Sequence, residues 1–296
     1  MRKLSLTLTL ALAALPAFAK DGKRIFISVD MEGIGGVVTD QQLGVPGFEY
    51  QKFRELMTEE TNAAIAAARE AGASEFVVAD SHGNFQNLLV DKLPADVQLV
   101  RGAPRPLGMM QGIDDSFDGV VFIGYHASTA NAEGVRAHTM SSANLADLKL
   151  NGTSVTEGAW NAATAAHYGV PVLAVSGDEA AVKEVQALVP GAEGAIVKWP
   201  YGFHSARVLM PEASRNLIKD AVRKGYAKRA QLTPVKTRTP LEVEIRFKAY
   251  RPSEVLSWLP FFKRVDSHAV RFTAKDMLEA SRILSFVMNY QVELQP

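Results

Sequence analysis

Short apolar runs that alternate with longer helical patterns constrain the fold of this chain most strongly. Runs rich in β-branched and aromatic residues lie at 24–30, 75–80, 97–100, 119–125, 171–175 and 195–197. Helical spacing of apolar residues occurs between or after them, at 49–70, 157–168, 177–188 and 211–228. Near-continuous apolar strands separated by amphipathic helices are typical of parallel sheets. The sequence therefore predicts an α/β fold, with a mostly parallel sheet and helices on both of its faces.

The pattern changes in the last fifth of the chain. Residues 241–247 alternate between apolar and polar, as a half-exposed strand does. Further helix and strand patterns follow. We therefore predict an α/β catalytic domain over 20–235 and a smaller C-terminal α+β segment over 236–296, which is a candidate region for oligomerisation.

The first 19 residues have the pattern of a signal peptide. Arg2 and Lys3 precede an apolar run, and Ala17-Phe18-Ala19 fits the small-residue cleavage pattern. The run is about a dozen residues long, short of the roughly 20 that a membrane-spanning helix requires. We expect cleavage before Lys20, export, and a periplasmic location if the source is Gram-negative. No later stretch predicts stable membrane insertion.

Charge and cysteine content exclude several classes of function. The chain has 32 basic and 32 acidic residues, and removing the leader with its two bases leaves 30 against 32, a net charge of −2. This balance offers no general footprint for nucleic acid. Because the chain has no cysteine, it has no disulfide, thiolate zinc site or cysteine nucleophile. Any metal site must use carboxylates and imidazoles.

Such side chains follow three of the predicted strands. Asp30 and Glu32 follow the first strand, His82 the second, and His126 the fourth. The carboxyl ends of parallel strands meet at one edge of a sheet, where ligands bind. At strand period 2 the two carboxylates point to the same side. One such residue alone is more often a turn or scaffold residue, but the set favours a metal site suited to Zn²⁺, with Mn²⁺ or Co²⁺ as possible substitutes.

The same motifs resemble a known family. The set comprises Ser28-Val-Asp-Met-Glu-Gly33, Ser81-His-Gly83, Gly124-Tyr-His126, and Asn151-Gly152 followed by Glu157. In order and spacing it resembles the D-aminopeptidase family of zinc peptidases. The resemblance implies two Zn²⁺ per subunit, bound by five ligands: Asp30, Glu32, His82, His126 and Glu157. It also implies that Asp30 bridges the two ions and that His138 is a catalytic histidine which is not a ligand.

The resemblance further implies the reaction and the assembly. We expect an exported aminopeptidase that removes the N-terminal residue of short peptides through a metal-bridged hydroxide, with the peptide's free amine on the second ion. A homodecamer with the sites facing an enclosed channel is implied as well. Whether the pocket admits D- or L-residues stays open.

Two other functions compete with a peptidase at this point. A binuclear phosphoesterase uses similar Asp and His ligands to activate water. A non-catalytic periplasmic protein that binds a metal or a peptide would need the ligands but not His138.

Overall fold

The computed structural model describes residues 23–290, so the predicted signal peptide at 1–19 lies outside the described residues. The larger of its two sheets has seven strands, in the order β3-β2-β1-β4-β7-β8-β9. These are β1 (Arg24–Val29), β2 (Glu75–Asp80), β3 (Val97–Val100), β4 (Gly119–Tyr125), β7 (Val172–Asp178), β8 (Glu193–Gly202) and β9 (Ser205–Val208). All neighbouring pairs are parallel except β8 and β9. The predicted mostly parallel sheet is confirmed.

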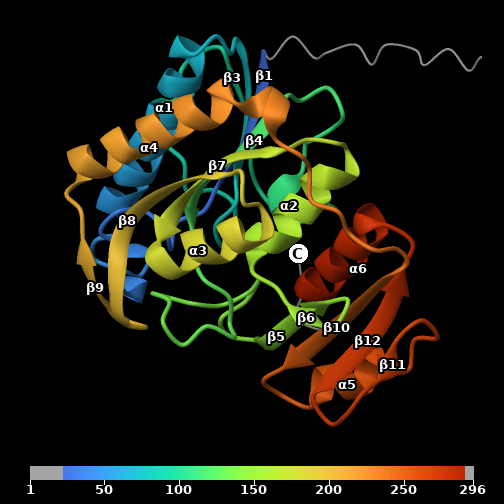
Figure 1. Ribbon diagram of the computed structural model, residues 1–296. Coiled ribbons are helices and arrows are strands. Elements are labelled where there is room, and N and C mark those ends of the chain that lie inside the picture. The colour runs from blue at the N-terminus through green and yellow to red at the C-terminus, as the bar shows by residue number, and fades with distance from the viewer. Residues whose placement is uncertain (1–22, 291–296) are drawn as a thin grey trace, which may run out of the picture.

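Helices cover both faces of this sheet, as predicted (Figure 1). On one face, Ile25 and Ile27 of β1 pack with α1 (Tyr50–Glu70) and α4 (Pro211–Ala227). On the other face, Phe26 belongs to a second core, to which α2 (Glu157–His167) and α3 (Glu179–Leu188) contribute. Alternate side chains of one buried strand thus enter two different cores, which explains why the strand is apolar throughout.

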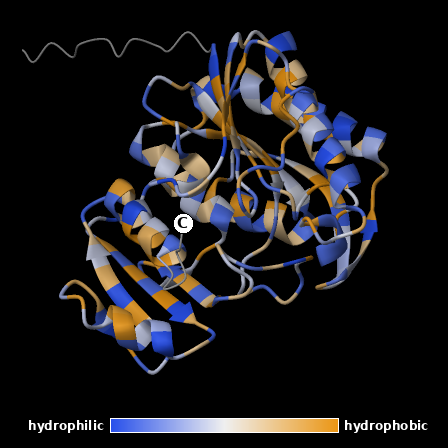
Figure 2. Ribbon diagram, turned by 180° about the vertical axis from the view of Figure 1, so that it is seen from behind, coloured by the Kyte–Doolittle hydropathy of each residue, from blue (hydrophilic) through white to orange (hydrophobic). Residues whose placement is uncertain are grey.

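A smaller antiparallel sheet forms the second part of the molecule. Its order is β11-β12-β10-β5-β6. These strands and their helices are β5 (Leu145–Leu150), β6 (Thr153–Ser154), β10 (Leu241–Phe247), β11 (Lys263–Arg264), β12 (Ala269–Ala274), α5 (Arg251–Leu256) and α6 (Met277–Asn289). Strand β10 alternates between apolar and polar residues along its length, as predicted for 241–247, and the smaller sheet shows bands of both kinds (Figure 2). Two strands of this sheet, β5 and β6, come from within the 20–235 range.

The two parts share an interface through α2. Trp160 and Ala163 of α2 belong to the core of the small sheet, and the Trp160 indole donates a hydrogen bond to Ser281 of α6 at 3.1 Å. Three short 3₁₀ helices complete the described chain: η1 (Asp40–Gln42), η2 (Gly108–Met110) and η3 (Arg229–Gln231). Between residues 23 and 290, no helix has both the length and the apolar character that crossing a bilayer requires.

Candidate metal centre

The three predicted strand ends lie side by side. Strand β1 is paired with β2 on one side and β4 on the other. Asp30 directly follows β1, His126 directly follows β4, and His82 follows β2 by two residues. His138 lies in the segment after β4, and Glu157 is the first residue of α2. The fold therefore brings all six candidate residues to one edge of the sheet.

A close backbone contact places the β1 turn against β4. Gly33 N–H donates to the Gly124 carbonyl at 2.7 Å. A Cβ on Gly33 would lie 2.1 Å from the backbone carbonyl oxygen of Tyr125, and a Cβ on Gly124 would lie 2.2 Å from the backbone carbonyl oxygen of Asp30. Gly124 also has a φ of +72°, which L side chains rarely adopt. Both glycines are thus required for the approach of Asp30 to His126.

The expected reason for the common direction of Asp30 and Glu32 is wrong. Strand β1 ends at Val29, and both carboxylates belong to the turn that follows it. Strand alternation therefore does not orient them. Their convergence comes from the turn itself, which bends back against β4.

One group of metal-ligand side chains is formed by Asp30, Glu32 and His82, whose ligand atoms lie within 4.8 Å of one another. His82 Nδ1 is 2.8 Å from Glu32 Oε2 and 3.4 Å from Asp30 Oδ1. His82 Nε2 lies 2.8 Å from the Leu43 carbonyl and donates to it. This backbone acceptor fixes the tautomer that turns the Nδ1 lone pair toward the carboxylates.

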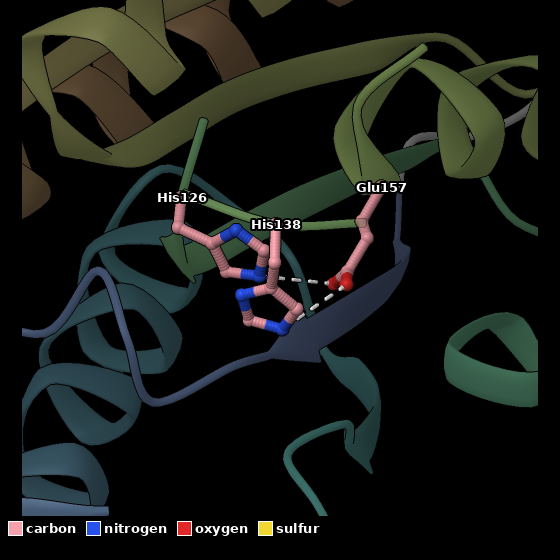
Figure 3. A group of neighbouring side chains, drawn as sticks. All are labelled: His126, His138 and Glu157. Carbon is pink, nitrogen blue, oxygen red and sulfur yellow. Dashed lines mark ion pairs between the residues drawn. The ribbon is translucent and has the colours of Figure 1, made fainter. Parts of the chain in front are cut away.

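A second group is formed by His126, His138 and Glu157 (Figure 3). Glu157 Oε2 lies 3.3 Å from His126 Nε2, and Glu157 Oε1 lies 3.8 Å from His138 Nε2. Glu157 is held by the start of α2, where the Thr156 hydroxyl caps the helix, and by the Met140 N–H, which donates to Oε1 at 2.6 Å.

Asp30 lies between the two groups. Its Oδ1 faces His82, whereas its Oδ2 lies 3.2 Å from His126 Nε2. Asp30 Oδ2 and His126 Nε2 are both buried and form no hydrogen bond. Buried polar atoms are normally hydrogen-bonded. These two atoms form an ion pair only while His126 is protonated, and with a neutral imidazole both are acceptors that face one another, which suits a shared cation.

The orientation of His138 differs from that of a ligand to the same ion as His126. Their rings stack at a centroid distance of 4.0 Å and an angle of 11° (Figure 3). An imidazole binds a metal through a nitrogen lone pair that lies in the ring plane. Two parallel stacked rings cannot both direct such a lone pair to one point, so one of the two histidines would hold an ion bound here and the other would not. The stacking favours one histidine as ligand and the other as a neighbour of the site.

Charge is strongly coupled within the centre. Burial raises the pKa of Asp30, and the charge of Glu32 raises it further. Burial also raises the pKa of Glu32. The charge of His82 and the hydrogen bond that His82 donates outweigh this effect and hold the pKa of Glu32 well below its usual value. Burial lowers the pKa of His82 and His126, yet the carboxylates raise both well above the usual value. Without metal the imidazoles thus retain protons, which metal binding must release.

Two buried charged residues lie behind the centre, and the sequence predicted a role at the site for neither of them. Lys198 of β8 is fully buried and donates to the carbonyls of Glu32, Ile34 and Val37. Glu60 of α1 accepts a hydrogen bond from Gly35 N–H at 3.0 Å. Burial raises the pKa of Glu60 to about 7, although the Gly35 N–H and the charge of Lys198 oppose the shift.

The shifted pKa of Glu60 predicts a pH-dependent stability. Because the folded pKa lies above the unfolded value, ionisation of Glu60 costs stability as pH rises from about 4.5 to 7. In chelator-treated protein, the free energy of unfolding can be measured by urea denaturation at pH 5 and pH 7.5. Between these two pH values, that of wild type should fall by about 2 kcal/mol more than that of Glu60→Gln. The glutamine keeps an acceptor for Gly35. Parallel pH dependence in the two proteins would contradict the prediction.

Comparisons with known proteins identify the family to which the chain belongs. Residues 23–286 match the profile of peptidase family M55, described as D-aminopeptidase. A D-aminopeptidase of Bacillus subtilis (strain 168) is 34% identical over 258 residues, which cover 87% of this chain and 93% of the relative.

A solved structure shows the same fold. The Zn-dependent D-aminopeptidase DppA from Bacillus subtilis, described as a self-compartmentalizing protease, is similar with a TM-score of 0.85 and 33% identity. The similarity covers 90% of this chain and 99% of that chain. These matches favour a peptidase over the phosphoesterase and the binding protein. The family resemblance predicted from the motifs is confirmed, and the chain belongs to the M55 family of D-aminopeptidases.

Proposed function

We propose that the chain is a zinc-dependent aminopeptidase that holds two Zn²⁺ per subunit and removes the N-terminal residue of short peptides. The observation that carries this proposal is the position of Asp30, whose two carboxylate oxygens face two different groups of ligand-type side chains. A carboxylate in this position suits a bridge between two cations. The Zn dependence of the similar Bacillus subtilis protein supports the choice of metal.

The side chains fit the proposed ions. Asp30, Glu32 and His82 would hold one ion, and Asp30, His126 and Glu157 the other. Carboxylate oxygens and neutral imidazoles are suitable ligands for Zn²⁺, and Mn²⁺ or Co²⁺ can substitute at such a set. Two buried atoms that form no hydrogen bond, Asp30 Oδ2 and His126 Nε2, would both gain the ion as a partner once His126 is neutral.

His138 is the proposed catalytic residue. Its Nδ1 lies 2.8 Å from the Arg136 carbonyl and donates to it, so the neutral ring presents an unprotonated Nε2 to the centre. This nitrogen can take a proton and pass it to the leaving amine, or, once protonated, donate a hydrogen bond to the developing oxyanion. Zinc ions held by the neighbouring carboxylates and imidazoles would lower the pKa of a bound water toward neutrality and would polarise the scissile carbonyl.

The proposed activity is tested with the four stereoisomers of Ala-Ala. Mature protein loaded with Zn²⁺ should release N-terminal alanine, and isomers that begin with D-Ala should be cleaved with a kcat/KM at least about tenfold higher than those that begin with L-Ala. Chelation should reduce cleavage to background because the ions supply the nucleophile, and added Zn²⁺ should restore it. Loaded protein that cleaves none of the four would refute the proposal.

We propose that the subunits assemble into a homodecamer. The description of the relative as self-compartmentalizing supports an assembly. We propose that exposed apolar side chains between residues 250 and 265 of the smaller part form an apolar patch that binds a second copy of the chain: Tyr250, Trp258, Phe261 and Val265 are exposed by 62%, 74%, 49% and 43%. Large exposed apolar patches are typical of interaction sites.

The proposed interface at this patch predicts how a substitution changes the mass of the assembled protein. Trp258→Glu should shift the protein to a smaller species in light scattering, because the substitution places a charge where apolar surface would be buried. The matched control is Val90→Glu, at an exposed apolar residue on the larger part, which should keep the wild-type mass. An unchanged mass for Trp258→Glu would contradict the patch as an interface.

Export through the segment 1–19 is also a proposal. Expressed with its complete sequence in a Gram-negative host, the protein should be recovered from the periplasmic fraction with Lys20 as its N-terminal residue, as mass spectrometry can determine. Recovery of the uncleaved chain from the cytoplasm alone would contradict export.

A further inference from the structure

A buried lysine lies behind the turn that carries Glu32. Lys198 is fully buried, and its Nζ donates to the Glu32 carbonyl, to the Ile34 carbonyl at 3.0 Å and to the Val37 carbonyl at 2.7 Å. It reaches this turn from β8, 166 residues further along the sequence. All three ammonium hydrogens thus have an acceptor in one short stretch of backbone.

The contacts are made at a position where a charge is costly. Burying an ammonium is unfavourable unless its hydrogen bonds are satisfied, and no carboxylate of the described residues forms an ion pair with Lys198. The backbone also depends on the lysine. Within residues 23–290, no backbone N–H donates to the Glu32 or Val37 carbonyl. Lysine and turn therefore satisfy each other.

We propose that Lys198 is a positioning residue of the metal centre, which holds the 32–37 turn and thereby presents the Glu32 carboxylate to the ion on the His82 side. The inference rests on the proposed two-ion site. Lys198 acts through the backbone, because its Nζ contacts the Glu32 carbonyl and not the side chain that faces His82. Glu60 holds the same turn from α1 through Gly35 N–H.

The effect of Lys198 should be confined to one ion. The groups that fix the side chains of the other ion lie outside the 32–37 turn: Glu157 is held by the α2 N-terminus and Met140 N–H, and His126 follows β4 and donates from Nδ1 to the Ala127 carbonyl at 3.0 Å. The turn contacts β4 through Gly33 N–H, whereas Lys198 bonds the carbonyls of residues 32, 34 and 37. Loss of the lysine should therefore weaken binding of the ion held by Glu32 and His82 and leave the affinity for the ion held by His126 and Glu157 unchanged. A residue needed only for general stability would not divide the two ions in this way.

The test measures metal binding of the mature protein rather than activity. Lys198→Met keeps an unbranched side chain of similar reach and removes the ammonium. Wild type should retain two Zn²⁺ per chain in competition with a chromophoric chelator. Lys198→Met should bind the ion held by Glu32 and His82 at least about tenfold more weakly. When Co²⁺ replaces Zn²⁺, wild type should show the visible absorption of two bound ions, and Lys198→Met should retain that of one.

The control for lost stability is Leu284→Ala. Leu284 is buried between α6 and the small sheet and belongs to a core that contains no metal-centre residue. Its truncation leaves a cavity and destabilises the protein, but it should leave both ions bound with affinities within about threefold of wild type. If Leu284→Ala loses one ion in the same way, the division is a consequence of lost stability and the inference is overturned.

A double variant tests the route through Glu32. If Lys198 acts by placing Glu32, then the variant that combines Lys198→Met with Glu32→Gln should bind the ion on the His82 side no more weakly than Glu32→Gln alone. Additive losses in the double variant would show that Lys198 acts by another route and would overturn the inference.

If Lys198→Met does not fold, Lys198→Gln gives the same readout. Its amide can donate two hydrogen bonds, and it should weaken the second ion to a lesser degree. Two ions bound as in wild type by whichever variant folds would overturn the role of Lys198 while leaving the proposed function intact. A wild-type protein that holds fewer than two ions would instead refute the proposed function and, with it, this inference.

Discussion

Asp30→Asn should abolish most activity while leaving the fold intact. The substitution keeps the shape of the side chain and the acceptor for Met31 N–H, but removes the charge that lies between the two ligand groups. Two cations would then lack their shared carboxylate. Because a metal ion contributes several kcal/mol to catalysis, we expect kcat/KM for D-Ala dipeptides to fall by at least about 10³-fold.

Metal content and stability separate this effect from unfolding. Asp30→Asn should bind less than two Zn²⁺ per chain, whereas its metal-free form should be at least as stable as metal-free wild type, since burial makes the carboxylate costly and raises its pKa. Asp96→Asn is the control, because Asp96 is paired with Arg69 at the surface. Asp30→Asn with two tightly bound ions and near-normal activity would contradict the bridge.

His138→Ala should lower kcat by about 10²- to 10⁴-fold, the usual contribution of a general acid or base. Unlike Asp30→Asn, it should retain two Zn²⁺ per chain, because two rings that stack in parallel cannot both direct an in-plane lone pair to one ion, and His126 is the proposed ligand. Steady-state kinetics and metal analysis of the same preparation measure both quantities.

His268→Ala provides the matched histidine control. His268 lies in a turn of the smaller part, where its ring contacts the Ser267 hydroxyl, and its loss should leave kcat unchanged. Loss of one ion from His138→Ala would show that His138 is a ligand and would contradict its assignment as a catalytic residue.

Much of the larger sheet could be predicted because β1, β2, β4 and β7 are almost entirely buried and rich in apolar residues, and β3 is short but mostly apolar. β2, β3 and β4 lie where the apolar runs at 75–80, 97–100 and 119–125 predict them. The strands β5 and β6 could not be predicted in the same way. β5 is half-exposed, and its partner β10 lies about 90 residues further along the chain, so the pairing has no local signal.

The candidate site was predicted from the order of its side chains along the chain. Residues that directly follow parallel strands must meet at one sheet edge, and this consequence of topology brought Asp30, His82 and His126 together. Strand alternation did not apply beyond Val29. Backbone carbonyls orient the three histidines: His82 bonds the Leu43 carbonyl, His126 the Ala127 carbonyl and His138 the Arg136 carbonyl. Because every residue has a carbonyl, the residue type does not reveal these partners.

Lys198 shows a second limit of the sequence. A lysine in an apolar strand normally indicates an exposed edge, because an isolated buried ammonium is costly. Here the compensating acceptors lie in the 32–37 turn, which only the folded chain brings to β8. The sequence contains both partners but not their contact.

The central claim, a pair of ions that share Asp30, is tested most directly by anomalous X-ray diffraction at the zinc edge from crystals of the mature, Zn²⁺-loaded protein. Two anomalous peaks are predicted in each subunit. One should lie among Asp30, Glu32 and His82, and the other among Asp30, His126 and Glu157, with His138 outside bonding distance of both. A single peak, or two peaks with no shared contact to Asp30, would contradict the account.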